Sequence, residues 1–384
     1  QGGASQFNST VTVGVNDTGY DVKLFGATSG AYMLWDESAD DLKLVGAAGL
    51  TVAGDIDIDG TTNLDVVDVD GAVNFAADVT FADGADIITA SAGTSNFRAG
   101  VNAGNSIASG GNYNVVVGDG AGTAITTGDN NTFIGTSSGD ATTTSNSNTA
   151  VGSQSLTANT TGAGNVGMGM GALAANTTAS FNTAVGYAAL DANTTGANNV
   201  AVGSGAAGAN TTGTGIVAVG TNSLDANTTG TYNVAIGNDS LSGNTTGTHN
   251  VAAGQGALYA NTTGTYNTGL GVSALDANTS ASNGTAVGGN ALGANTTGEA
   301  NTAVGSLALD ANTTGGSNNA FGVGALGANV DGANNNAHGL NALTDNVSGS
   351  GNVAMGHAAL QDNLASNNTA VGFLSMQLNT TATG

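Results

Sequence analysis

The sequence has no cysteine and no proline, and aromatic residues make up only 4% of its 384 residues. Without cysteine, the chain can form neither disulfide bonds nor thiolate metal sites. Charged residues amount to 8%, against about 25% in an ordinary soluble domain. A thick globular core needs bulky side chains, whereas this chain contains 64 glycines. The composition therefore indicates a thin, repetitive structure built on small residues.

Positive charge is nearly absent as well. The basic residues are Lys23, Lys43 and Arg98 alone, whereas 27 acidic residues bring the formal net charge to −24. Phosphate backbones and anionic membranes are held by lysine and arginine. No apolar run reaches the ~18 residues of a membrane span. We therefore expect neither nucleic acid nor membrane insertion.

A glycine recurs at a constant interval along most of the chain. It ends a short motif such as Ala-Val-Gly and stands at 118, 135, 152 and so on to 356, a spacing of 17, before a final interval of 16 leads to Gly372. Gly100 resembles a degenerate earlier copy. A fixed period of this length is typical of solenoids, whose units stack on their neighbours. The sequence predicts an all-β protein with a parallel β-solenoid of about 16 coils over residues 100–384, one coil for each repeat.

The residues before this repeat glycine alternate in size, as in a strand whose side chains point to opposite faces. Valine and similar residues occupy the first and third positions of the strand, and alanine or glycine the second. A leucine follows in a second short strand or a turn. We predict that the bulky residues form the interior core ladder, which comprises Val151, Val185, Val202, Val219, Leu156, Leu190 and Leu224.

The small face of the same strand needs a separate explanation, because polar residues are rare there. Small side chains allow a second backbone layer to approach closely. We predict that this face is a seam between subunits, formed by Ala184, Ala201, Ala218 and Ala235. The alternative is a solvent-facing surface kept small for the packing of turns.

Asparagine recurs at two positions of the coil. The asparagine four residues before the repeat glycine predicts a corner ladder that satisfies buried amides, with Asn148, Asn165, Asn182 and Asn199 as members. The other asparagine usually opens the sequence Asn-Thr-Thr-Gly. That triplet matches the N-glycosylation acceptor, but we interpret it as turn chemistry copied from coil to coil.

Candidate chemical sites are few. Asp55, Asp57 and Asp59 resemble the start of a calcium loop, but the twelfth position is Val66 and not the glutamate that the loop requires. We interpret them as outward strand carboxylates, the alternative being a weakly bound calcium ion between subunits. We expect no other metal and no cofactor.

The three histidines indicate no catalytic group, because His249, His338 and His357 occupy three different coil positions. No nucleophile, base and orienting group can be assembled around them. We therefore expect no enzymatic activity. His338 is expected in the interior, as a tolerated substitution, and Trp35 and Tyr32 are expected to pack within the first segment.

The repeat resembles a known family at stretches such as NNVAVGSGA (residues 198–206) and NTAVGSLAL (residues 301–309). These are similar to the head repeats of trimeric autotransporter adhesins. The resemblance implies left-handed β-rolls that associate as homotrimers. The coil here is about three residues longer than the common head repeat.

The first hundred residues resemble a second family. The stretches GYDVKLFGATSGAYMLWDESADDLKLVG (residues 19–46) and LTVAGDIDIDGTTNLDVVDVDGAVNF (residues 50–75) are similar to shaft regions of marine bacteriophage tail fibres. Alternating apolar and acidic residues predict strands there independently. We assign residues 1–99 to a β-rich shaft or connector.

Together these features favour a structural fibre, a phage tail fibre or a related appendage for host-cell attachment. Its expected location is the virion, and its expected partners are itself, other fibre proteins and a host receptor such as a glycan. One alternative is a bacterial surface adhesin or extracellular filament subunit, and another is an ice-binding solenoid with stacked threonines. Because the chain stops within a coil, we expect the natural product to continue beyond both ends.

Overall fold

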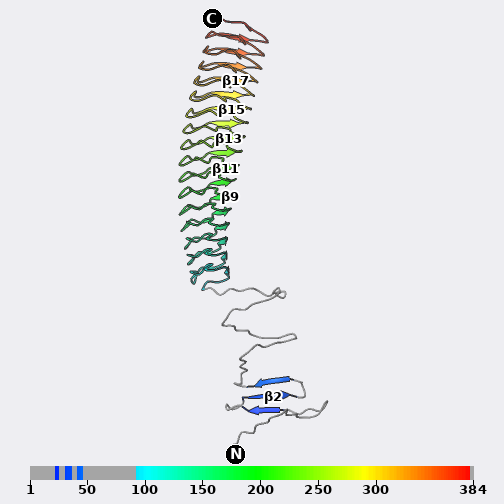
Figure 1. Ribbon diagram of the computed structural model, residues 1–384. Coiled ribbons are helices and arrows are strands. Elements are labelled where there is room, and N and C mark those ends of the chain that lie inside the picture. Colours follow the sequence, from blue (N-terminus) through cyan, green and yellow to red (C-terminus); the bar gives the residue numbers. More distant parts are fainter. Residues whose placement is uncertain (1–21, 26–30, 37–40, 46–91, 381–384) are drawn as a thin grey trace, which may run out of the picture. The chain divides into compact units, whose positions relative to one another are not determined.

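The computed structural model describes residues 22–25, 31–36, 41–45 and 92–380 (Figure 1). The chain divides into two units, Gln1–Thr80 and Phe81–Gly384, and each is described by itself. Every element in the described ranges is a β-strand. No helix in those ranges has the length and apolar character needed to cross a bilayer.

The first unit contains a small antiparallel sheet. Its strands are β1 (Val22–Phe25), β2 (Tyr32–Asp36) and β3 (Asp41–Val45), with β2 in the middle. The Lys23 ammonium lies 3.3 Å from the centre of the Tyr32 ring and 5.2 Å from that of Phe25, which is cation–π geometry. Tyr32 therefore packs within this sheet, as expected, whereas Trp35 is 42% exposed.

The second unit is a parallel β-solenoid with one three-residue strand in each coil (Figure 1). The strands are β4 (Phe97–Ala99), β5 (Val115–Val117), β6 (Thr132–Ile134), β7 (Thr149–Val151), β8 (Val166–Met168), β9 (Thr183–Val185), β10 (Val200–Val202), β11 (Val217–Val219), β12 (Val234–Ile236), β13 (Val251–Ala253), β14 (Thr268–Leu270), β15 (Thr285–Val287), β16 (Thr302–Val304), β17 (Asn319–Phe321), β18 (Asn336–His338), β19 (Val353–Met355) and β20 (Thr369–Val371).

Strands that follow one another in the sequence pair with each other, and the register equals the repeat. Val200, Ala201 and Val202 of β10 lie beside Val217, Ala218 and Val219 of β11, the equivalent residues of the next coil. The strands β5 to β20 confirm the sixteen predicted coils. β4 adds a coil that pairs Phe97 with Val115. The stack thus includes residues before position 100, where we had placed its start.

The repeat glycine ends each strand in a conformation that other residues avoid. Its φ lies between +129° and +145° throughout the stack, a region open to glycine alone. A Cβ atom on Gly220 would also lie 2.5 Å from the carbonyl oxygen of Gly237 in the next coil. Both the turn and the close stacking therefore require glycine at this position.

The leucine segment is a turn and not a second strand. Leu224 has a φ of +56°, the left-handed conformation that is uncommon for a leucine. Its backbone N–H donates to the carbonyl of Ser240 in the next coil at 3.0 Å, and its side chain is fully buried. Burial and the contact with the next coil together hold this strained turn.

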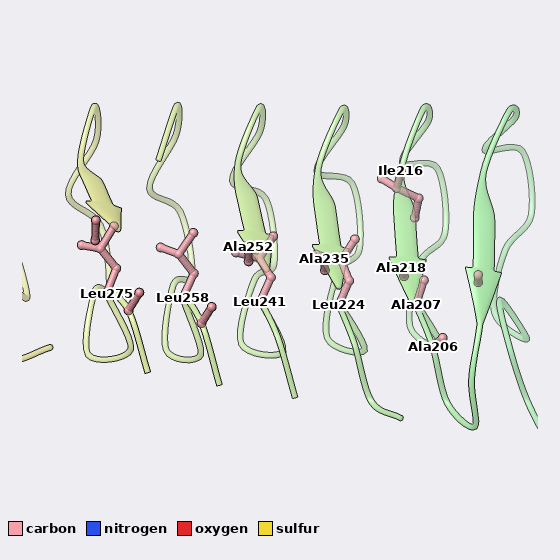
Figure 2. Packing of buried hydrophobic residues seen from close by; sticks show 14 of the residues in the cluster. Ala206, Ala207, Ile216, Ala218, Leu224, Ala235, Leu241, Ala252, Leu258 and Leu275 are labelled. Atoms are coloured by element: carbon pink, nitrogen blue, oxygen red, sulfur yellow. The ribbon is translucent and has the colours of Figure 1, made fainter. Parts of the chain in front are cut away.

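The interior consists mainly of alanine, leucine and asparagine, with a few other buried side chains such as Val116, Phe133 and Ser155. In Figure 2, the labelled leucines Leu224, Leu241, Leu258 and Leu275 follow one another from coil to coil beside the strand alanines. Leu156, Leu190 and Leu224 are fully buried, which confirms the leucine half of the predicted core ladder.

The valine half of that ladder is wrong. Val202 is 38% exposed and Val151, Val185 and Val219 are only partly buried, because the first and third residues of each strand point out of the coil. Where the leucine is present, the interior leaves no room for a bulky strand residue. Phe133 points inward from the second position of β6, but in that coil Gly139 stands at the leucine position, and a Cβ on Gly139 would lie 2.6 Å from the Phe133 ring.

The alanine seam is wrong for the same reason. Ala184, Ala201, Ala218 and Ala235 have no exposed surface within a single chain. They cannot contact another subunit, because they already fill the centre of their own coils. The alternation of the strand was predicted correctly, but its two faces were assigned the wrong way round.

Candidate functional site: asparagine ladders and the outer strand face

The predicted corner ladder is present and fully buried. The Oδ1 atom of Asn148 accepts the backbone N–H of Asn165 at 2.9 Å, and the Oδ1 atom of Asn165 accepts that of Asn182 at 3.0 Å. The side-chain amide of Asn182 donates to the carbonyl of Gly196 at 2.9 Å. Asn148, Asn165, Asn182 and Asn199 thus satisfy buried backbone groups of the neighbouring coils, as predicted.

A second asparagine ladder, here called the loop ladder, runs from Asn159 to Asn379 at the start of the Asn-Thr-Thr turns. The Nδ2 atom of Asn193 donates to Oδ1 of Asn176 at 3.0 Å and to the carbonyl of Gly196 at 2.9 Å. Both amide hydrogens are therefore used inside the coil, and Asn193 is fully buried. This bonding agrees with the interpretation of the triplet as turn chemistry.

The two ladders meet at shared acceptors. Asn182 of the corner ladder and Asn193 of the loop ladder donate to the same carbonyl, that of Gly196. Each buried hydrogen bond of this kind contributes about 0.5–1.5 kcal/mol, and an unmet buried amide costs more. Because the bonds join each coil to the next, they oppose any change of register along the stack.

The corner ladder is interrupted at two coils. The Oδ1 atom of Asn199 accepts the N–H of Ile216, and that of Asn267 accepts the N–H of Gly284. Ile216 and Gly284 carry no amide with which to continue the ladder. Between them stands a segment of only three asparagines, Asn233, Asn250 and Asn267. The loop ladder passes both points without interruption.

The first and third residues of β5 to β20 form what we call the outer strand face. The first position holds valine, threonine or asparagine, and the third is apolar except at His338. Val202, Ile236 and Met355 are 38%, 46% and 47% exposed. No charged residue occurs at either position in these sixteen strands. The third positions thus form a long uncharged stripe, apolar except at His338, on a chain with a net charge of −24.

His338 lies on this outer strand face, so its expected interior position is wrong. It is exposed, and its ring stacks on Phe321 of the preceding strand with centroids 4.5 Å apart. His357 stacks on Phe373 at 5.2 Å, and His249 lies between Tyr232 and Tyr266. Each of the three histidines therefore belongs to a different group of stacked rings.

The threonines of the Asn-Thr-Thr turns differ in exposure. Thr194, the first of its pair, is partly buried, and its hydroxyl donates to the carbonyl of Thr211 at 3.0 Å. Thr195, the second, is exposed. In most Asn-Thr-Thr turns only the second threonine is exposed, although Thr262 and Thr263 are both exposed. The hydroxyls of the first row, such as that of Thr262, are used in joining coils.

Some acidic residues lie where water is partly excluded. Burial raises the pKa of Asp191, Asp276 and Asp310, and hydrogen bonds from nearby backbone N–H groups oppose the shift. Burial also raises the pKa of Asp345, with a further contribution from Asp362 in the next coil. These four aspartates lie in the turns of their coils, and none of them is on the outer strand face.

The calcium candidates Asp55, Asp57 and Asp59 lie outside the described residues, so their interpretation stays a prediction. In the part of the chain that the structure describes, no three His, Asp or Glu side chains gather as metal ligands would. Comparison of the chain with protein-family models, curated proteins and solved structures returned no match.

We predict that Gly284→Asn stabilises the solenoid. The new Oδ1 atom would accept the N–H of Asn301, and its amide would donate to Gly298, as Asn267 donates to Ala281 at 2.8 Å. One or two added buried hydrogen bonds should raise the free energy of unfolding by about 1–3 kcal/mol, measured by denaturant unfolding.

Gly289→Asn is the matched control, because a Cβ on Gly289 meets nothing within 4 Å. It introduces the same side chain without a ladder partner. The ladder account is contradicted if Gly284→Asn stabilises the chain no more than Gly289→Asn does.

Proposed function

We propose that this protein is the structural part of an attachment fibre, a phage tail fibre or a related receptor-binding appendage, outside the cell. The observation that carries the proposal is the outer strand face, which gives a rod-like stack a continuous surface for assembly. The resemblance of residues 19–46 and 50–75 to tail-fibre shafts supports the choice of a phage fibre.

In this proposal, copies of the chain associate through their outer strand faces. The stripe follows the stack through sixteen strands, and each copy offers an equal stripe to the others. Large exposed apolar patches mark interaction sites, and a second copy is the one partner certain to match this length and periodicity. The adhesin-like repeat supports three copies.

The stack is suited to a mechanical role. Backbone strand pairing joins each coil to the next, and buried asparagine bonds add further links. Such a rod transmits force along its axis through many parallel hydrogen bonds. The scattered positions of the histidines support a function without catalysis, and other virion or fibre proteins would join the rod to a particle.

A bacterial surface adhesin or filament subunit would use the same face in the same way. Ice binding is a second candidate function, because Thr268, Thr285 and Thr302 form a regular row at the first position of adjacent strands. The third position, however, has no hydroxyl in any of these strands. The outer strand face is therefore better suited to protein association than to ice.

We predict that the wild-type chain self-associates at micromolar concentration and that Val202→Glu with Ile236→Glu abolishes association. Charges two coils apart on the apolar stripe would be buried without partners, at a cost of several kcal/mol. Sedimentation velocity should show folded monomers, with circular dichroism unchanged.

The control is Thr212→Glu with Thr246→Glu, which places the same charges two coils apart on exposed turns. It should stay associated. A wild-type monomer, or equal association of both double variants, would show that the outer strand face is not the assembly surface.

Attachment itself is tested by two assays on the assembled protein. We expect it to adsorb to cells within a panel of bacterial strains, or to block virion adsorption, and to leave ice growth unchanged. Thermal hysteresis that disappears in Thr268→Leu/Thr285→Leu/Thr302→Leu would instead establish ice binding. Failure of both adsorption and competition would count against the attachment role.

A further inference from the structure

Three aromatic rings form an exposed stack on consecutive coils. Tyr232, His249 and Tyr266 occupy the same coil position, directly before a corner-ladder asparagine. The ring centres of Tyr232 and His249 are 5.1 Å apart, and those of His249 and Tyr266 are 4.9 Å apart. Tyr232 is 58% exposed and Tyr266 is 59% exposed. Large rings are thus held together in water rather than buried in a core.

The backbone fixes where these rings stand. All three residues have a φ of +57° to +59°. The N–H of His249 donates to the carbonyl of Thr231 in the preceding coil, and that of Tyr266 to Thr248, both at 3.1 Å. Ordered rings lose little conformational entropy when a ligand binds, which favours affinity.

The stack covers ring faces and leaves polar atoms accessible. A Cβ on Gly215 would lie 2.8 Å from the Tyr232 ring, so that ring rests on the preceding coil. His249 lies 17° from parallel to Tyr266, so these two rings cover each other. The three exposed residues carry phenol hydroxyls and imidazole nitrogens, which can donate and accept hydrogen bonds.

Threonine hydroxyls flank the stack in each of its coils. Thr229, Thr246 and Thr263 are exposed and stand three residues before the three rings, and Thr231, Thr248 and Thr265 stand directly before them. The surface therefore alternates aromatic edges with hydroxyl groups at the coil repeat of about 4.8 Å.

The charge of the chain selects the kind of ligand. No lysine or arginine follows Arg98, so the repeats around the stack offer no permanent cation to phosphate, sulfate or carboxylate, and the net charge of −24 repels anions. Aromatic edges and neutral hydroxyls instead match a ligand with many hydroxyl groups and no charge.

We propose that Tyr232, His249 and Tyr266 form a binding site for a neutral saccharide chain. The ring edges contact the apolar C–H groups of the sugars, and the phenol, imidazole and threonine groups bond to the sugar hydroxyls. The inference rests on the proposed attachment function, because it assigns receptor contact to a defined part of the rod.

The test measures binding of neutral hexasaccharides of glucose, mannose, galactose and N-acetylglucosamine, with a uronic acid hexasaccharide as the anionic probe. Saturation-transfer NMR detects binding to the assembled protein, and calorimetry gives affinity. We expect a neutral hexasaccharide to bind, and Tyr232→Ala/His249→Ala/Tyr266→Ala to weaken it by about tenfold or more. Tyr232→Phe/Tyr266→Phe, which keeps the rings, should weaken binding less.

The matched control is Tyr113→Ala. Tyr113 has the same coil position, a φ of +58° and 60% exposure, but Asn130 follows it in the next coil, so no ring stacks there. Its loss should leave saccharide binding unchanged. The proposal is overturned if no neutral probe binds, if the uronic acid probe binds more tightly, or if the triple variant binds as well as wild type.

Cell adsorption of the same variants separates this site from the function on which it rests. If the triple variant adsorbs like wild type, attachment stands and the saccharide site is not its receptor contact. If the wild type binds a neutral saccharide and adsorbs to no cells, the site stands and the attachment proposal fails. If the triple variant is less stable than the wild type but binds the saccharide equally well, the three rings stabilise the fold and do not bind the ligand.

Discussion

Burial of asparagine amides is the constraint on which the solenoid depends. Each amide must find partners inside a narrow coil. These partners are the asparagine at the equivalent position of a neighbouring coil and nearby backbone carbonyls such as that of Gly196. Inserting or deleting a residue would move an asparagine away from its hydrogen-bond partners, unless the altered residue lies in a part of the coil that does not position the asparagines. The late coil that is one residue shorter keeps the bond from Asn368 to Asn352, at 2.9 Å.

Narrowness then determines which residues face outward. Where leucine and two asparagines fill the coil, the strand sends only alanine or glycine inward. Val116 and Phe133 point inward in coils where glycine takes the place of the leucine. The β-branched residues that favour a strand are left on the outside. An uncharged apolar stripe is therefore a direct consequence of a small core, and the proposed assembly of several chains would remove such a stripe from water.

The sequence predicted the period, all coils but the first, the leucine interior and the corner ladder, because each depends on a residue type repeated at one spacing. It did not predict that the side chain of Ala201 points into the coil and that of Val202 points out of it. Alternation shows that two faces differ, but the choice between them depends on the width left inside the coil. The loop ladder was missed because Asn-Thr-Thr-Gly is also ordinary turn chemistry. The stack of Tyr232, His249 and Tyr266 could have been found from the sequence, because these residues are spaced by one repeat each.

The stacking of one coil per sequence repeat is tested most directly by distances between spin labels. The chain has no cysteine, so cysteines introduced in place of exposed Thr161, Thr229 and Thr297 can be labelled in pairs and diluted with unlabelled chain. Thr161 and Thr229 are four coils apart, and Thr161 and Thr297 eight. At about 4.8 Å per coil, pulsed electron paramagnetic resonance should give distances of about 19 Å and 38 Å. Distances that do not double with the number of coils would contradict the solenoid.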